Sequence, residues 1–188
     1  MQEPIPGTLP GPNGNQIAYV TTSGKAPGII FLGGYMSDMT GTKASSLEML
    51  CREIGHAYIR FDYSGHGLSG GDFQAGSIST WTDDTLAVLD NIAVGPQILV
   101  GSSMGGWIML LAALARKKQV AGLVGIASAS DFTRRLAEDE LTDEQITDIY
   151  RDGSITIKSP YAEEPYIFTR TLLEDGAKHL LLDRKIEL

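Results

Sequence analysis

The stretch QILVGSSMGGWIML, residues 97–110, places two serines and three glycines between two apolar runs. The run before the serines is short and continuously apolar, which is typical of a strand buried on both faces of a sheet. The run after them is long enough for a helix and ends in Arg116, Lys117 and Lys118, whose charges suit the C-terminal end of a helix dipole. The stretch therefore predicts a buried strand that passes directly into a buried helix.

Residues Gly101 to Gly105 match the pattern G-x-S-x-G at this junction, with Ser103 at its centre. An ordinary Gly/Ser-rich turn is the alternative, but the motif and its strand–turn–helix context agree, so we interpret it as a nucleophile elbow. In such a turn the serine has a strained backbone with positive φ, and the helix N-terminus favours a developing anion. We expect Ser103 to be a nucleophile and the backbone N–H of Met104 to donate to the oxyanion.

A second oxyanion donor is expected from the loop after the apolar run at residues 28–32. This loop reads GGYMSDMTGTK, and the backbone N–H of Tyr35 is the candidate. A phosphate-binding P-loop does not fit, because the spacing from Gly34 to Gly41 is too long and the order is Gly-Thr-Lys. GHGLSG at residues 65–70 matches a dinucleotide-binding pattern, but a polar loop follows it where a helix would be needed. Neither loop predicts nucleotide binding.

Strand and helix signals alternate along the chain around the elbow. Alternation of this kind predicts an α/β fold, with a mostly parallel central sheet and helices on both faces. The expected strands cover residues 16–21, 28–34, 56–63, 97–101 and 120–129, and the expected helices cover residues 43–55, 80–92 and 104–118.

Two of these helices carry more specific predictions. Helix 43–55 has one apolar face, which we expect to be buried. Its members are Leu47, Leu50, Cys51 and Ile54. Cys51 is interpreted as a core residue and not as a reactive thiol. Thr80 and Asp83 form a capping-box pattern, which predicts that the next helix opens at Thr80.

Composition and charge limit the class of protein. With 188 residues, of which 43% are hydrophobic and 20% charged, the chain indicates one soluble globular domain. A single cysteine, and a start that lacks signal- and transit-peptide features, favour the cytoplasm. No stretch approaches the ~18 apolar residues that a membrane span needs. A net charge of −8 without a basic stripe argues against nucleic acid as a partner.

The charge is unevenly distributed along the chain. Residues 1–130 carry 7 basic and 9 acidic side chains, a net charge of −2, whereas residues 131–188 carry 8 and 14, a net charge of −6. We therefore divide the single domain, residues 1–188, into a core segment, residues 1–130, and a cap segment, residues 131–183.

The cap segment has weaker structural signals. Thr142 and Gln145 form a capping box, and Leu141 with Ile146 forms a hydrophobic staple, so a short helix is expected from Thr142 to Gly153. A strand and a further helix are expected at residues 154–161 and 171–182.

Four motifs in one order along the chain resemble the α/β-hydrolase superfamily. They read FLGGYMSDMTGTKA, AYIRFDYSGHGLSGG, TWTDDTLAVLD and ILVGSSMGGW. More narrowly, from about residue 28 to residue 182, they resemble the branch of the mitochondrial acyl-protein thioesterase and mycophenolic acid acyl-glucuronide esterase, with its bacterial relatives. The resemblance implies hydrolysis of small-molecule esters or acyl-thioesters through an acyl-enzyme on Ser103, with Met104 and Tyr35 as oxyanion donors. It implies neither metal nor cofactor, and a cap that covers the acyl pocket.

In this family an aspartate and then a histidine follow strands that come after the cap. The chain stops at HLLLDRKIEL, where the next strand would begin, so a truncated member without its last core strands is expected. Among the residues present, Asp131 and His179 are the candidates for a substitute relay with Ser103. His56 is expected to be structural, and His66 a turn residue that lines the site entrance.

Two classes of function stay open at this point. One is a serine esterase or thioesterase, which Ser103 in an elbow favours. The other is a non-catalytic α/β-hydrolase-like binding module or remnant, which the missing acid and base favour for this polypeptide. Strand 120–129 is expected to have one bare edge, which predicts self-association through that edge.

Overall fold

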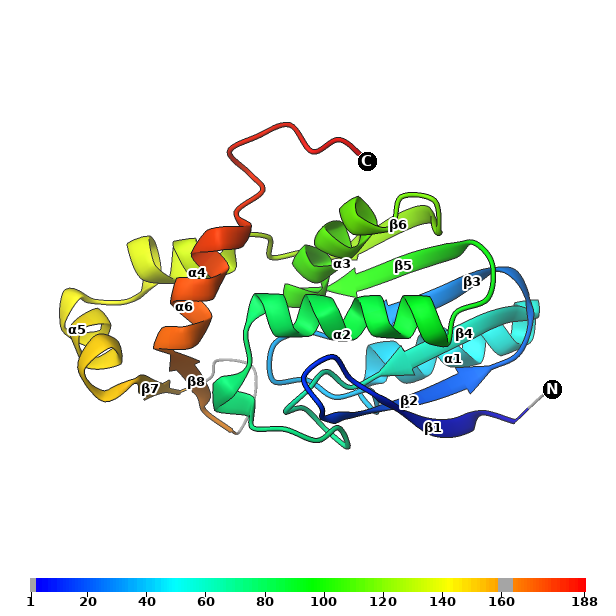
Figure 1. Ribbon diagram of the computed structural model, residues 1–188, viewed down its shortest axis with the longest axis horizontal. Helices are drawn as coiled ribbons and strands as arrows, with labels where there is room; N and C mark the ends of the chain where they lie inside the picture. Colours follow the sequence, from blue (N-terminus) through cyan, green and yellow to red (C-terminus); the bar gives the residue numbers. More distant parts are fainter. Residues whose placement is uncertain (1–2, 159–163) are drawn as a thin grey trace.

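The computed structural model describes residues 3–158 and 164–188 (Figure 1). Its centre is a six-stranded sheet with the strand order β1-β2-β4-β3-β5-β6. The four strands from β3 to β6 run parallel, and β2 and β1 extend one side of the sheet antiparallel. These strands are β1 (Ile5–Pro10), β2 (Gln16–Thr22), β3 (Lys25–Leu32), β4 (His56–Phe61), β5 (Gln97–Ser102) and β6 (Val120–Ile126). The predicted α/β fold with a mostly parallel sheet is confirmed.

Helices cover both faces of the sheet, as expected. In Figure 1, α2 (Ile78–Asn91) and α3 (Met104–Ala115) lie in front of it, and α1 (Thr42–Ile54) lies behind. The larger core fills the front, where Trp81 and Trp107 are completely buried. The parallel strands therefore end at one edge, and that edge meets the loops that precede α1, α2 and α3.

The buried face of α1 differs from the predicted one. Cys51 is completely buried, as expected, but Leu50 and Ile54 are 48% and 46% exposed. Glu48 lies on the buried face, where its carboxylate accepts hydrogen bonds from the Nε of Arg60 at 3.0 Å and from the hydroxyl of Thr22 at 3.0 Å. A paired charge thus occupies a place that hydrophobic periodicity assigns to an apolar side chain.

The start of α2 also differs from the prediction. The helix begins at Ile78 after the N-cap Ser77, whose hydroxyl accepts a hydrogen bond from the backbone N–H of Thr80. The expected opening at Thr80 is therefore wrong, because Thr80 is already within the first turn. A short 3₁₀ turn, η1 (Phe73–Ala75), precedes this helix.

The cap segment lies at the carboxyl ends of the parallel strands, on the left in Figure 1. Its elements are α4 (Phe132–Arg135), a π turn η2 (Leu136–Glu140), α5 (Asp143–Asp152), the antiparallel hairpin of β7 (Ser154–Ile157) and β8 (Tyr166–Thr169), α6 (Arg170–Gly176) and a 3₁₀ turn η3 (Ala177–His179). The capping box of Thr142 and Gln145 is confirmed at the start of α5. Residues 159–161 of the strand expected at 154–161 lie outside the described residues.

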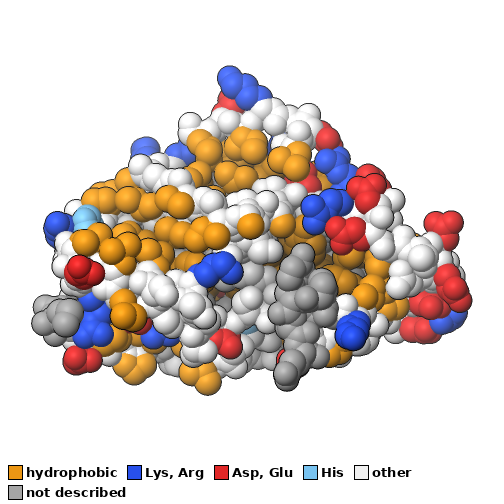
Figure 2. All heavy atoms as spheres, turned by 180° about the vertical axis from the view of Figure 1, so that it is seen from behind, with side chains coloured by type: hydrophobic (Ala, Val, Ile, Leu, Met, Phe, Trp, Pro, Cys, Tyr) orange, Lys and Arg blue, Asp and Glu red, His pale blue; other side chains and the backbone are white. Residues whose placement is uncertain are grey.

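Strand β6 is the last strand of the sheet among the described residues. Val124, which is in register with Val100 of β5, is 47% exposed. Figure 2, seen from behind, shows hydrophobic side chains gathered in rows on this face of the molecule. In the described part of the chain, no helix is long and apolar enough to cross a membrane.

Candidate active site

Ser103 stands at the turn between β5 and α3 with φ 53° and ψ −122°. A non-glycine residue in this region is strained by ~1–3 kcal/mol, so the surrounding structure must hold it there. Its backbone N–H donates to the carbonyl of Ile126, and its carbonyl accepts from the N–H of Ala129, both at 3.0 Å. The side chain is exposed and makes no capping hydrogen bond to α3. The positive φ and the exposed side chain that the sequence predicted for Ser103 are both observed.

Two glycines allow the backbone to pass through this turn. A Cβ at Gly105 would lie 2.2 Å from the carbonyl oxygen of Leu32, and a Cβ at Gly101 would lie 2.4 Å from the carbonyl oxygen of Gly105. Both distances are far shorter than any contact that a side chain tolerates, and both involve backbone that cannot move aside. The spacing of glycines in the motif is therefore a packing requirement of the turn.

The loop after β3 passes directly over the elbow. A Cβ at Gly34 would lie 3.3 Å from the Cβ of Ser103, and Tyr35 is the next residue. Met36 then has φ 53°, a second strained backbone position that sequence reasoning missed. Met104 is the first residue of α3, so its N–H has no acceptor within the helix. Among the described residues, no backbone acceptor of the Tyr35 N–H is found either. Both N–H groups are thus available near Ser103.

The side chain of Tyr35 connects this loop to the cap segment. Its hydroxyl donates to the carbonyl of Ile167 in β8. Its ring is stacked on Phe168 at 5.7 Å with an interplanar angle of 7°, and it lies 5.8 Å from the ring of Phe132. Burial raises the pKa of the hydroxyl well above its usual value, so it stays protonated and remains a donor. Sequence reasoning missed this contact, because no local pattern marks a hydrogen bond to a residue so distant in the chain.

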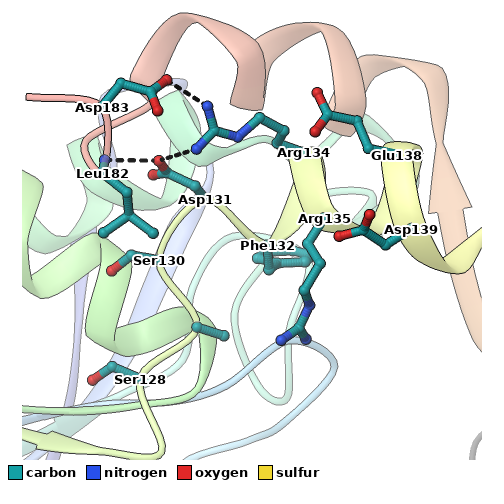
Figure 3. A pocket seen from close by; sticks show the side chains of 11 residues that line it. Ser128, Ser130, Asp131, Phe132, Arg134, Arg135, Glu138, Asp139, Leu182 and Asp183 are labelled. Carbon is teal, nitrogen blue, oxygen red and sulfur yellow. Dashed lines mark hydrogen bonds and ion pairs between the residues drawn. The ribbon is translucent and has the colours of Figure 1, made fainter.

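A hollow of about 570 Å³ opens between the loop after β6 and the cap segment (Figure 3). Ala129, whose N–H donates to the carbonyl of Ser103, lies in its wall. The rest of the wall comes from the loop after β6, from α4 and η2, and from Leu182 and Asp183. Arg134 in this wall pairs with Asp183 and lies 3.7 Å from a carboxylate oxygen of Asp131. The hollow therefore has both polar and apolar sides, and Ser103 is not among the residues that line it.

The substitute relay of Ser103, His179 and Asp131 is not formed, so this prediction needs correction. Both carboxylate oxygens of Asp131 accept hydrogen bonds from the N–H groups of Leu181 and Leu182, at 2.9–3.0 Å. Figure 3 shows Asp131 turned toward Leu182 and Arg134. The carboxylate of Asp131 therefore stabilises the end of the cap segment.

His179 lies where the end of the cap segment contacts the core helices, beside Ser79 of α2 and Trp107 of α3. Its Nε2 lies 2.7 Å from the hydroxyl of Ser79 and 3.8 Å from a carboxylate oxygen of Asp175. Asp175 also accepts from the backbone N–H of Ser79 at 2.7 Å. Burial acts to raise the pKa of Asp175, but its hydrogen bonds from Ser79 and Ser77 and the nearby His179 outweigh burial and lower it. These groups attach α6 to the N-terminus of α2.

The other two histidines also have structural partners. His56 opens β4, and its Nδ1 lies 2.8 Å from the carbonyl of Pro27, as expected of a structural residue. His66 is only 4% exposed and packs on Phe73 and Trp81, so the prediction that it lines the site entrance is wrong. Burial lowers the pKa of His66 to about 4, with the Ser64 carbonyl acting in the opposite direction. His66 is thus held neutral inside the loop that follows β4.

Across residues 3–158 and 164–188, no group of three or more His, Cys, Asp or Glu side chains is arranged to hold a metal ion. The described site offers the hydroxyl of Ser103, a residue with a strained backbone, beside the backbone N–H groups of Met104 and Tyr35.

Comparison with known proteins agrees with this geometry. A family model described as serine aminopeptidase, S33, matches residues 29–147, more than half of the chain. The mitochondrial palmitoyl-protein thioesterase ABHD10 of Rattus norvegicus is 46% identical over 171 residues, which cover 90% of this chain and 57% of that protein. The chain thus spans less than two thirds of the length of this relative.

Solved structures show the same fold. A putative hydrolase from Agrobacterium vitis S4 has a TM-score of 0.92 and 40% identity, over 98% of this chain and 76% of that one. Alpha/beta hydrolase domain-containing protein 10 from mouse has a TM-score of 0.86 and 41% identity, over 97% and 73%.

One sequence-based expectation is overturned by these relatives. The chain was expected to be cytoplasmic, but the ABHD10 relatives from four mammals are named as mitochondrial proteins, so that expectation is wrong. The resemblance to the α/β hydrolases is confirmed by the strand order and by the family match. The chain belongs to the serine aminopeptidase, S33, family of hydrolases and has the α/β-hydrolase fold.

Proposed function

We propose that the chain is a serine hydrolase of carboxylic esters or thioesters, with Ser103 as its nucleophile. The observation that carries the proposal is the strained, exposed Ser103 at φ 53° on the N-terminus of α3. The name of the rat relative, a palmitoyl-protein thioesterase, supports an acyl-thioester as the substrate class. The thioester can belong to a small molecule or to an acylated protein. Its carbonyl reacts with a serine hydroxyl without a bound metal ion.

The reaction follows from this arrangement. The Oγ of Ser103 attacks the carbonyl carbon, a C–O bond forms, and the carbonyl electron pair moves onto oxygen. The N–H groups of Met104 and Tyr35 donate to that oxyanion, which is the point where preorganised donors contribute most. The carbonyl then re-forms as the C–S or C–O bond breaks, and the leaving group takes up a proton from water. Water hydrolyses the acyl-enzyme to the free acid and restores the Ser103 hydroxyl. The acyl chain is proposed to lie under the cap segment, next to the hollow in Figure 3.

The proton of Ser103 has no histidine acceptor in the described site and passes to water. The rings of His56, His66 and His179 all have partners elsewhere. Without a general base, the oxyanion donors and substrate binding alone leave a rate roughly 10³–10⁴-fold above the uncatalysed one. We therefore expect the 188-residue chain to hydrolyse p-nitrophenyl esters slowly.

The same histidine contacts favour the second candidate function, a non-catalytic binding module. The two candidates differ in what replacement of the serine does. Hydrolysis of p-nitrophenyl butyrate is measured for the native chain, for Ser103→Ala, and for Ser102→Ala as the adjacent buried control. Loss of hydrolysis in Ser103→Ala alone supports the serine hydrolase. Equal, buffer-level rates in all three chains favour the binding module.

We also propose that a chain of these 188 residues self-associates through β6. Its outer backbone groups have no strand partner among the described residues, and its exposed Val124 carries no charge that would discourage pairing. Light scattering across a concentration series tests this. A monomer that persists at ~100 μM, a concentration at which exposed strand edges associate, contradicts the proposal.

A further inference from the structure

Tyr35 contacts two separate regions of the molecule, the elbow at Ser103 and the hairpin of the cap segment. Its backbone follows Gly34, which lies against Ser103, and its N–H is the proposed oxyanion donor. Its hydroxyl donates to the carbonyl of Ile167, in the hairpin formed by β7 and β8. A single residue therefore joins the elbow to a hairpin that lies 132 positions further along the chain.

We propose that Tyr35 is a positioning residue through which the β7–β8 hairpin sets the oxyanion donor. When the hairpin is docked, the Tyr35 side chain holds the loop over Ser103; when the hairpin is released, the donor loses its place. This inference rests on the proposed function and adds to it a role for the cap segment in the chemical step, beyond covering the substrate.

Besides Tyr35, the loop is held at its two ends. The Tyr63 hydroxyl donates to the Gly33 carbonyl at 3.5 Å, and the Met39 N–H donates to Asp62 at 2.6 Å while the Met39 carbonyl accepts from Arg60 at 2.9 Å.

The loop begins with two glycines, Gly33 and Gly34, which have the widest choice of backbone angles. Met36 has φ 53°, a strained value that persists only where the surroundings over-determine it. A turn hydrogen bond from the Ser37 N–H to the Gly34 carbonyl, at 3.2 Å, is local to the loop. Between these ends, in residues 34–38, the hydroxyl of Tyr35 makes the one hydrogen bond found among the described residues to a partner outside the loop.

The anchorage of the Tyr35 ring is extensive. Aromatic rings from η1, α2, α4 and β8 surround it, with centroid distances from 5.2 to 6.3 Å. They belong to Phe73, Trp81, Phe132, Tyr166 and Phe168. Two of these rings, Tyr166 and Phe168, come from the hairpin itself, so docking of the hairpin completes the aromatic cage. The Ile167 carbonyl lies between them in sequence and accepts the hydroxyl.

The test uses the 188-residue chain and three variants. Tyr35→Phe keeps the ring and removes the hydrogen bond, and Phe168→Leu perturbs the same contact from the hairpin side. Tyr150→Phe, on the exposed face of α5, is the matched tyrosine-to-phenylalanine control. Steady-state hydrolysis of p-nitrophenyl butyrate gives kcat and KM, and amide hydrogen exchange is followed at residues 33–38.

Both Tyr35→Phe and Phe168→Leu are expected to lower kcat about tenfold with KM changed less than about twofold. Displacing an oxyanion donor costs less than removing it, which lowers kcat about 10²–10³-fold. Exchange at residues 33–38 rises in both variants, while β5 and α3 keep native rates, and Tyr150→Phe behaves as the native chain.

Three results would overturn the proposal. The first is a native kcat in Tyr35→Phe when Ser103→Ala abolishes hydrolysis. The second is unchanged exchange at residues 33–38. The third is an equal rise of exchange in β5 and α3, which indicates general loss of stability. If the native chain shows no Ser103-dependent hydrolysis, the proposed function fails, and exchange alone decides whether the hairpin holds the loop.

Discussion

The elbow and the cap segment are held in place by different parts of the chain. At the elbow, backbone packs on backbone: Gly105 meets the carbonyl of Leu32, and the backbone of Ser103 is hydrogen-bonded to Ile126 at the end of β6 and to Ala129 after it. The cap segment is attached by side chains, namely the hydroxyl of Tyr35, the carboxylate of Asp175 and the indole N–H of Trp107, and Asp131 joins its two ends. Backbone packing admits almost no variation, whereas a few side-chain contacts can open locally without unfolding the rest. We infer a rigid nucleophile beneath a cap segment that opens more readily.

The largest effect is expected from a methyl group at the elbow. In Gly105→Ala the new Cβ meets the carbonyl oxygens of Leu32 and Gly33 at 2.2 and 2.5 Å, so the turn must be pushed apart. We expect a loss of about 3 kcal/mol in the free energy of unfolding, measured by urea denaturation. Gly122→Ala in β6 is the control, because its Cβ would lie 3.6 Å from the nearest side-chain atom, on Ile98. Equal stability of the two variants would show that the elbow is not rigidly packed.

A smaller and more local effect is expected in the cap segment. Asp131→Asn replaces the carboxylate that accepts hydrogen bonds from the N–H groups of Leu181 and Leu182. We expect a cost of about 2 kcal/mol, seen as faster amide exchange at residues 170–182 with β5 unchanged. Asp139→Asn, on the exposed side of η2, should leave exchange as it is. If Asp131→Asn instead unfolds the whole chain as Gly105→Ala does, the contrast between core and cap segments is lost.

A third prediction concerns two buried groups of the core segment that titrate in opposite senses. Burial raises the pKa of Asp84 to about 6, although Ser64 donates two hydrogen bonds to it. The folded chain therefore binds a proton at Asp84 before the unfolded chain does, and stability rises as the pH falls below 6. His66, with its pKa lowered to about 4 by burial, does the reverse between pH 6.5 and 4. The two contributions largely cancel in the native chain.

Single substitutions should separate them. His66→Gln leaves Asp84 alone, so the free energy of unfolding should rise on acidification from pH 6.5 to 4.5, relative to the native chain. Asp84→Asn leaves His66 alone, so it should fall. Each contribution is at most about 1.4 kcal/mol per pH unit. Urea denaturation at several pH values measures both slopes, and slopes of the same sign in the two variants would contradict the assignment.

The smallest effect is expected at the exposed side of α1. Leu50 is 48% exposed, so Leu50→Ser should change the free energy of unfolding by no more than about 0.5 kcal/mol. Cys51 is completely buried, and Cys51→Ser should cost about 1–2 kcal/mol, because a hydroxyl replaces a packed thiol. Thermal unfolding compares the two variants. A larger loss of stability in Leu50→Ser than in Cys51→Ser would mean that Leu50 is buried, as the sequence predicted.

What the sequence could predict follows the same division. The elbow was predictable because its glycines and serine occur at fixed spacing between two apolar runs. The face of α1 was not, because Glu48 is buried through pairing with Arg60, and periodicity treats a charged residue as exposed. Strand β1 was missed because Pro6 and Pro10 resemble turn residues, although both are tolerated in an edge strand. Tyr35 was assigned for its backbone only, since nothing local points to Ile167.

The central claim is that the elbow makes Ser103 reactive, and covalent labelling measures this most directly. The folded chain is incubated with a fluorophosphonate probe, and the site of modification is located by mass spectrometry. We predict one adduct per chain on Ser103, absent in Ser103→Ala and retained in Ser102→Ala. An unlabelled native chain, or an adduct on another serine with Ser103 unmodified, would contradict the account.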